Sequence, residues 1–157
     1  EEEIANAILL LLEIEKTVVE GAGAVPLAAL VNKKVALAGK TVALVLSGGN
    51  IDVNLISRII ERGLVKDGRL VRLAVMLRDR PGELARLTAL VAEMRANVLH
   101  ILHDRAFSRA RLGQTEVELT LETSGRDQID AVKRHLAEAG YAVHEIVRRP
   151  SSASPAP

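Results

Sequence analysis

Strict alternation of apolar and polar residues over 114–123 is the strongest constraint on what this chain can fold into. Val117, Leu119 and Leu121 share one side of an extended segment, because successive side chains of a strand point to opposite faces. The other side carries Glu116, Glu118 and Glu122. A strand with one apolar face and one polar face is typical of an antiparallel sheet that is covered on one side only.

The residues around this strand complete a β-α-β-β-α-β order. Apolar positions alternate before Asp79 and recur at helical spacing after Gly82, and Gly140 marks the end of a second helical pattern. Split βαβ units of this kind form a four-stranded antiparallel sheet with both helices on one face. We therefore expect an α+β, ferredoxin-like domain over residues 69–148. Its predicted elements are strands over 71–77, 97–104, 114–123 and 141–147 and helices over 84–94 and 129–136.

The residues before position 66 show a different pattern, that of a partial α/β segment. Two helices are expected first, over 4–12 and 22–31. The continuous apolar run 41–46 predicts a strand buried on both faces of a parallel sheet. A helix follows, with Asp52 as its N-cap and Gly63 as its stop. Because one strand cannot form a sheet, we expect residues 1–65 to be an incomplete piece of a longer protein.

Composition excludes several classes of function. The absence of cysteine removes disulfides and thiolate chemistry and suits a cytoplasmic protein. A net charge of +1 and 1% aromatic residues argue against nucleic-acid binding. The early apolar run 7–12 is far shorter than the roughly 18 residues of a membrane helix, so no membrane is expected. The tail 149–157, rich in Ser, Pro and Ala, is expected to be disordered.

Two histidines of the second predicted strand are candidate metal ligands. His100 and His103 lie three positions apart, so on a strand they point to opposite faces and are poor joint ligands. No metal site is therefore expected.

The turn Ser47-Gly48-Gly49-Asn50 is the first candidate site. Ligands of open α/β sheets bind beyond the carboxyl ends of strands, where glycines let a ligand approach the backbone. A plain tight turn between strand and helix explains the same residues equally well. Taken with Glu-Gly-Ala-Gly-Ala at 20–24 and Val-Leu-Ser-Gly-Gly-Asn-Ile-Asp-Val-Asn at 45–54, the turn resembles the threonine dehydratase (threonine ammonia-lyase) family. These are fold-type II pyridoxal-phosphate enzymes, and the resemblance is to forms with a single carboxyl-terminal regulatory domain.

That resemblance implies cofactor contacts for three residues. Ser47 would face the pyridine nitrogen of pyridoxal phosphate, with Gly48 and Glu20 near the same cofactor. A hydroxyl does not hold a proton on that nitrogen, so the ring is a weak electron sink, which suffices for eliminating a β-hydroxyl. The Schiff-base lysine and phosphate loop of the family have no counterpart in this sequence. We expect pyridoxal phosphate in the parent enzyme, none on this fragment, and no catalytic residue here.

The loop from Asp79 to Leu84 is the second candidate site. Proline near a helix start and an acidic first turn are ordinary helix-start signals, so a simple turn explains the loop. Its position between the first strand and first helix of a βαββαβ unit resembles the D-x-PG-x-L turn of ACT domains. In that family, amino-acid effectors bind between two copies of the domain. The resemblance implies a set of effector-binding residues: Asp79, Arg80, Gly82, Glu83, Leu84, Asn97 and Val98.

The chemistry of these residues suits an amino acid. Free N–H groups at the helix start suit a carboxylate, and Asp79 or Glu83 would hold the α-ammonium. An apolar pocket around Leu84 and Val98 favours a branched side chain such as that of isoleucine or valine. Together, the two resemblances predict the carboxyl-terminal regulatory part of a threonine dehydratase, assembled as a homodimer or tetramer. The alternative is an ACT-like module that dimerises and binds no effector.

Overall fold

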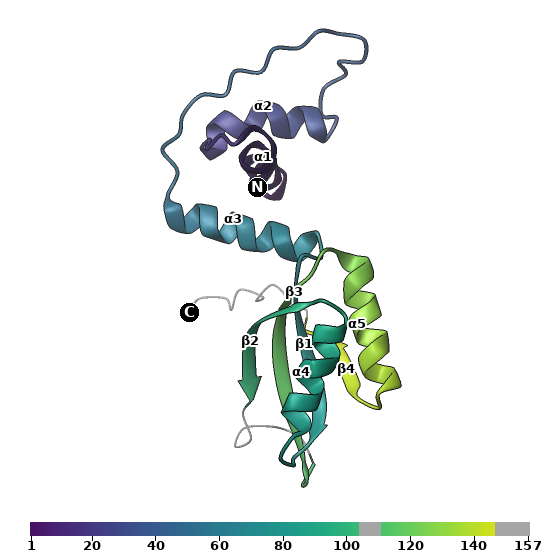
Figure 1. The fold of residues 1–157 in the computed structure, drawn as a ribbon. Helices are drawn as coiled ribbons and strands as arrows, with labels where there is room; N and C mark the ends of the chain where they lie inside the picture. Colours follow the sequence, from purple (N-terminus) through teal and green to yellow (C-terminus); the bar gives the residue numbers. More distant parts are fainter. Residues whose placement is uncertain (104–110, 147–157) are drawn as a thin grey trace, which may run out of the picture. The chain divides into compact units, whose positions relative to one another are not determined.

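The computed structural model describes residues 1–103 and 111–146, which divide into two compact units (Figure 1). The first unit is Glu1–Leu64 and the second begins at Val65. The tail predicted to be disordered, residues 149–157, lies outside the described residues, as do positions 104 and 147 of two predicted strands. The two units are described separately below.

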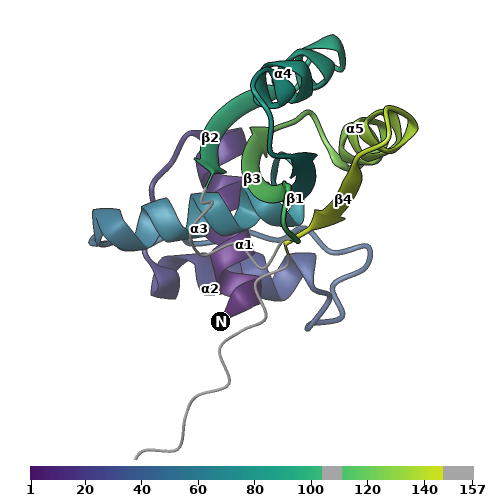
Figure 2. The ribbon, with the colours of Figure 1, turned by 90° about the horizontal axis from the view of Figure 1, so that it is seen from below.

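The second unit is a four-stranded antiparallel sheet with two helices on one face (Figures 1 and 2). Its strand order is β2-β3-β1-β4, so β2 and β4 are the edges. This topology confirms the α+β fold class expected from the alternation. The elements are β1 (Leu70–Arg78), α4 (Glu83–Glu93), β2 (Asn97–His103), β3 (Gln114–Glu122), α5 (Arg126–Glu138) and β4 (Ala142–Glu145).

The core of this unit lies between the sheet and the two helices. Odd-numbered residues of β1 and β3 form the inner face, and each of them is at most 3% exposed. Burying an aliphatic side chain of this size contributes about 1.5–3 kcal/mol, so this face is a major source of the stability of the unit. The buried apolar side chains are Val71, Leu73, Val75, Leu77, Val117, Leu119 and Leu121 from the strands and Leu87, Val91, Ile129, Val132 and Leu136 from the helices.

The first unit contains α1 (Glu2–Leu10), a π-helical turn η1 (Leu11–Glu15), α2 (Gly21–Val31) and α3 (Val53–Lys66). Its small core is mostly aliphatic and comprises Ala7, Ile8, Leu9, Leu11, Val19, Ala24, Ala28 and Ile59. No helix within the described ranges combines the length and apolar character needed to cross a membrane.

The strand predicted over residues 41–46 is wrong, because these residues form no strand. Val42 and Val45 are 38% and 74% exposed instead of buried. A strand is held by hydrogen bonds to a neighbouring strand, and residues 1–64 contain no strand that pairs with these residues. The apolar run 41–46 therefore has the residue pattern of a buried strand but has no neighbouring strand to pair with.

The predicted stop of α3 at Gly63 is also wrong, since the helix continues to Lys66. Gly63 lies against Leu9 of α1, and a Cβ at this position would overlap the Leu9 side chain. The glycine therefore permits close packing of two helices and does not end one. The start of α3 is as predicted: the Asp52 carboxylate accepts a hydrogen bond from the Asn54 N–H at 2.6 Å.

Leu119 lies at the centre of the second core with no exposed surface. We expect Leu119→Ala to lower the free energy of unfolding by about 2–5 kcal/mol, because the cavity adds to the lost apolar burial. Urea denaturation followed by circular dichroism measures this. Leu112→Ala is the matched control, since Leu112 is fully exposed and should change stability by less than about 0.5 kcal/mol. Equal losses in the two variants would contradict the core assignment.

Candidate functional site

Glu20, Ser47 and Gly48 come together in the first unit. The Glu20 N–H donates to the Gly48 carbonyl at 3.0 Å. Gly48 has a φ of +82°, and a Cβ there would overlap the Glu20 carboxylate. Gly23 is equally constrained, because a Cβ there would overlap the Ser47 carbonyl. The two glycine-containing motifs of the sequence therefore pack directly against each other.

This arrangement fits one side of a pyridoxal-phosphate site. Ser47 is exposed, so its hydroxyl is available to a ring nitrogen, and the absence of side chains at Gly23 and Gly48 keeps the backbone close around it. Two lysines of this unit are engaged elsewhere: Lys16 donates to the Glu13 carbonyl, and Lys34 pairs with Glu3 at 2.9 Å. Nothing in the described residues assembles a phosphate cradle around Ser47, so we derive no reaction step from this chain.

The loop residues 79–84 form what we call the α4-start cluster. The Asp79 N–H donates to the Gly113 carbonyl at 3.0 Å, and the Arg86 N–H donates to the Gly82 carbonyl at 3.0 Å. Gly82 precedes the helix with a φ of +89°, a conformation that favours glycine, and nothing lies within 4 Å of the position of a Cβ. The surface at Gly82 is therefore open to an incoming molecule.

Glu83 is held within this cluster by two neighbours. Its carboxylate accepts a long hydrogen bond from the Tyr141 hydroxyl at 3.4 Å and lies 4.0 Å from the Arg80 guanidinium. Its side chain is 18% exposed. Tyr141, which precedes β4, is 9% exposed, and the Arg86 guanidinium lies 6.0 Å from its ring centroid. The first turn of α4 is thus tied to the start of β4.

Asn97 and Val98 lie at the opposite end of the sheet from this cluster. β1 and β3 pair from Leu70 opposite Glu122 to Arg78 opposite Gln114. Asn97 is also opposite Glu122, so β2 begins where β1 begins, whereas α4 begins where β1 ends. The predicted effector residues therefore form two groups in a single chain, and Leu84 and Val98 do not line one pocket within it.

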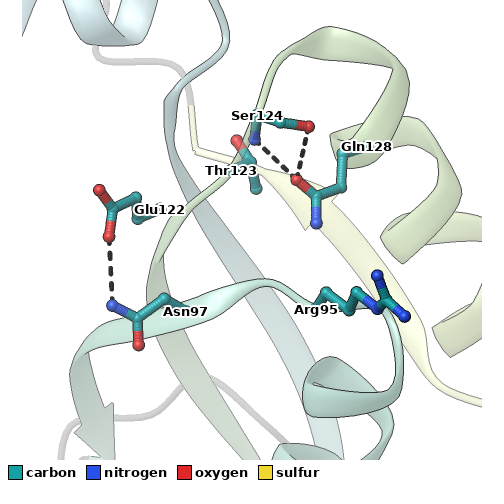
Figure 3. Close-up of a pocket in the computed structure, with 6 residues that line it drawn as sticks. All are labelled: Arg95, Asn97, Glu122, Thr123, Ser124 and Gln128. Carbon is teal, nitrogen blue, oxygen red and sulfur yellow. Dashed lines mark hydrogen bonds between the residues drawn. The ribbon is translucent and has the colours of Figure 1, made fainter.

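A hollow of about 380 Å³ lies at the start of β2 (Figure 3). Figure 3 shows Asn97 and Glu122 on one side, where the Asn97 amide donates to the Glu122 carboxylate at 3.1 Å. Ser124 and Gln128 lie on the other side, with the Gln128 carbonyl accepting from the Ser124 N–H at 2.6 Å. We call this the β2-start hollow; its lining residues are Arg95, Asn97, Glu122, Thr123, Ser124 and Gln128.

Residues 65–68, which begin the second unit, contact two residues at or next to this hollow. The Thr123 hydroxyl donates to the Gly68 carbonyl at 2.5 Å. Arg126 donates to the Val65 carbonyl of α3 at 3.4 Å and pairs with Glu145 at 2.9 Å.

Of the hollow residues, only Asn97 was singled out from the sequence. Glu122 belongs to the polar side of an alternating strand and carries no signal beyond that pattern. Arg95 did carry a usable signal: the three-residue connection between α4 and β2 has a left-handed residue at its second position, which usually holds glycine. An arginine there departs from the expected turn chemistry.

Two relatives match nearly the whole of this chain. Over 144 residues, 91% of its length, the chain is 56% identical to an L-threonine ammonia-lyase of Geobacter sulfurreducens. Over 146 residues, 93% of its length, it is 51% identical to an L-threonine ammonia-lyase of Thermotoga maritima. The chain is homologous to L-threonine ammonia-lyases. It spans 36% of the length of each of these two relatives.

The resemblance to threonine ammonia-lyases predicted from the two glycine motifs is thereby confirmed. A catabolic L-threonine dehydratase of Staphylococcus aureus is 45% identical over 67 residues, which is 41% of the chain. No model of a known protein family matches the sequence.

Solved structures resemble about half of the chain. The ACT domain of a GTP pyrophosphokinase of Chlorobium tepidum aligns with 49% of this chain and 96% of its own, with a TM-score of 0.40 and 15% identity. A prephenate dehydratase of Staphylococcus aureus aligns with 50% of this chain and 29% of its own, with a TM-score of 0.43 and 19% identity.

Tyr141 gives the α4-start cluster a pH dependence. Burial raises the pKa of Tyr141 above its ordinary value of 10.0, and the nearby Glu83 carboxylate raises it further against a smaller opposing effect of Arg86. Above pH 10 the unfolded chain therefore loses the phenol proton while the folded chain retains it. The stability that this proton supplies is present below pH 10 and is lost as the pH rises through the folded pKa.

We therefore expect Tyr141→Phe to show a smaller loss of stability between pH 9 and pH 11 than the unsubstituted chain. Urea denaturation at each pH measures the difference. The contribution of lysine titration to the pH dependence is the same in both chains and cancels in the comparison. Parallel pH dependences in the two chains would contradict the raised pKa of Tyr141 in the folded chain.

Proposed function

We propose that this chain is the carboxyl-terminal regulatory part of a threonine ammonia-lyase, an enzyme that converts threonine to 2-oxobutanoate and ammonia. In this proposal the second unit is an ACT domain that binds an effector amino acid, such as isoleucine or valine, between two copies. The identities over nine-tenths of the chain and the βαββαβ topology support it. The observation that carries it is the separation of the predicted effector residues into two groups.

One copy cannot bring these groups to a single ligand. The α4-start cluster follows Arg78, and Asn97 lies level with Leu70, eight residues away along β1. At a rise of about 3.3 Å per residue, this separation is roughly 26 Å, which is longer than a branched-chain amino acid. The two groups can form one site only if they come from different copies.

The exposed edge of β2 provides the geometry for such a pairing. Leu99, Ile101 and Leu102 are 47%, 42% and 58% exposed on this edge strand, and an unpaired edge favours addition of another strand. If two β2 strands pair antiparallel about a two-fold axis, the start of one lies beside the end of the other. The end of β2 is at the same end of the sheet as the start of α4. The dimer therefore has two equal sites, each with Asn97 from one copy and Gly82 from the other.

The first unit has a different role in this proposal. Ser47, Gly48 and Glu20 would form the side of the cofactor site that meets the pyridine ring, and the lysine and phosphate loop would come from residues outside this chain. Pyridoxal phosphate supplies the electron sink for elimination when it is bound in the complete enzyme. We expect the chain alone to bind effector without deaminating threonine.

Regulation of this kind requires two states with different affinities for the effector. A coupling free energy of about 1–3 kcal/mol is typical and changes the affinity by about 5- to 150-fold. Arg126 donates to the Val65 carbonyl and the hollow residue Thr123 donates to the Gly68 carbonyl, so both contact the segment that begins the second unit. In this proposal, movement at the effector site acts on that segment.

Mixing two defective variants tests the two-copy site. Gly82→Asn adds a side chain at the α4 start while tolerating the left-handed backbone, and Asn97→Ala removes a contact at the β2 start. Each variant alone should show no saturable binding of isoleucine or valine by calorimetry. After random exchange of copies, the mixture should recover about a quarter of the wild-type sites, because half of the dimers then carry one intact site of two.

A mixture of these variants that binds nothing, although each is folded and dimeric, would contradict the two-copy site. A wild-type chain that dimerises but binds no amino acid would instead support the alternative, a module for dimerisation alone.

A further inference from the structure

The β2-start hollow contains an arginine in an unfavourable backbone conformation. Arg95 has a φ of +56° and directly follows Met94, the C-cap of α4. The Arg95 N–H donates to the Ala92 carbonyl at 2.9 Å and the Ala96 N–H donates to the Val91 carbonyl at 3.4 Å, the pattern of a helix end that normally uses glycine. A side chain costs free energy in this conformation. An arginine at such a position indicates a role for its side chain.

The guanidinium of Arg95 is available for that role. Arg95 is exposed, and within the described residues its guanidinium makes no hydrogen bond or ion pair. Its five N–H donors match the geometry of a carboxylate. Arg95 is thus a cation of the hollow that is not neutralised by the residues around it.

The negatively charged group of the hollow, the Glu122 carboxylate, is held in place by a hydrogen bond. The Asn97 amide bonds to the Glu122 carboxylate at 3.1 Å, which orients one acidic group at the margin of the hollow. The far side is also fixed, because Gln128 bonds to Ser124 at 2.9 Å through its carbonyl and to the Met94 carbonyl at 2.8 Å through its amide. One cation and one oriented anion therefore line a space of about 380 Å³.

The α4-start cluster is less suited to a zwitterion. Glu83 places a negative charge in the first turn of α4, where it opposes the binding of a carboxylate to the helix N-terminus. Its own carboxylate is already near Tyr141 and Arg80, at 3.4 Å and 4.0 Å. The partly buried Leu84 and the open surface at Gly82 suit an apolar side chain better than a charged group.

We propose that the β2-start hollow holds both charged ends of the effector amino acid, with Arg95 binding the α-carboxylate and Glu122 binding the α-ammonium. The α4 start of the second copy then contacts the effector side chain. This inference rests on the proposed regulatory function and replaces the roles expected for Asp79 and Glu83.

Calorimetric titration of the full chain with L-isoleucine and L-isoleucinamide tests the role of Arg95. The amide lacks the carboxylate, so the wild-type chain should bind it at least about tenfold more weakly than isoleucine. Arg95→Gln should weaken isoleucine binding by at least about tenfold and bind the two ligands equally. Arg134→Gln is the matched control, since Arg134 is an exposed arginine of α5 outside the hollow, and it should bind like wild type.

Arg95→Gly separates a binding role from a structural one. Because glycine is favoured at this helix end, its unfolding midpoint in urea should equal or exceed that of the wild type while isoleucine binding is lost. Glu122→Gln should weaken isoleucine binding while keeping the preference for isoleucine over its amide.

The possible failures are distinguishable. Equal isoleucine binding by wild type and Arg95→Gln, with binding still lost in Gly82→Asn, would overturn the role of Arg95 and leave the regulatory function standing. A lowered unfolding midpoint in Arg95→Gly would also overturn it, by showing a structural role. If the wild-type chain bound none of isoleucine, valine, threonine and serine, both the inference and the proposed function would fail.

Discussion

The nine-residue antiparallel pairing of β1 with β3 is the constraint on which the rest of the second unit depends. Its register, from Leu70 opposite Glu122 to Arg78 opposite Gln114, buries every odd-numbered side chain of both strands and so creates the surface that α4 and α5 cover. A shift by one residue would turn that face to solvent. The same register places the start of α4 and the start of β2 at opposite ends of the sheet.

That separation links the fold to the proposed function. A sheet of this order has an uncovered edge at β2, and the two groups of predicted effector residues lie far apart within one copy. In the proposed dimer, the same antiparallel β2 pairing would cover the apolar edge and complete the divided site. Binding and assembly would then be one event in the proposed dimer.

The sequence predicted the second unit well because each of its elements depends on a local pattern. Alternation and helical spacing determine which face is buried, and Gly140, with a φ of +90°, ends the α5 region as expected. The strand predicted over 41–46 failed because a strand also requires a partner, which a local pattern cannot reveal. Gly63 was misread because contact with Leu9, distant in sequence, decides its role. The β2-start hollow was missed for the same reason, since Arg95, Glu122 and Gln128 meet only in the folded chain.

Sedimentation velocity of the chain with and without isoleucine tests the central claim most directly. If each effector site is built from two copies, isoleucine binds the dimer and not the single chain, so by mass action it must strengthen self-association. We predict that the dimer dissociation constant falls as isoleucine is added, and that Asn97→Ala removes this effect without preventing dimerisation. Saturable isoleucine binding with an unchanged dimer dissociation constant would show that one copy holds the whole site and would contradict the account.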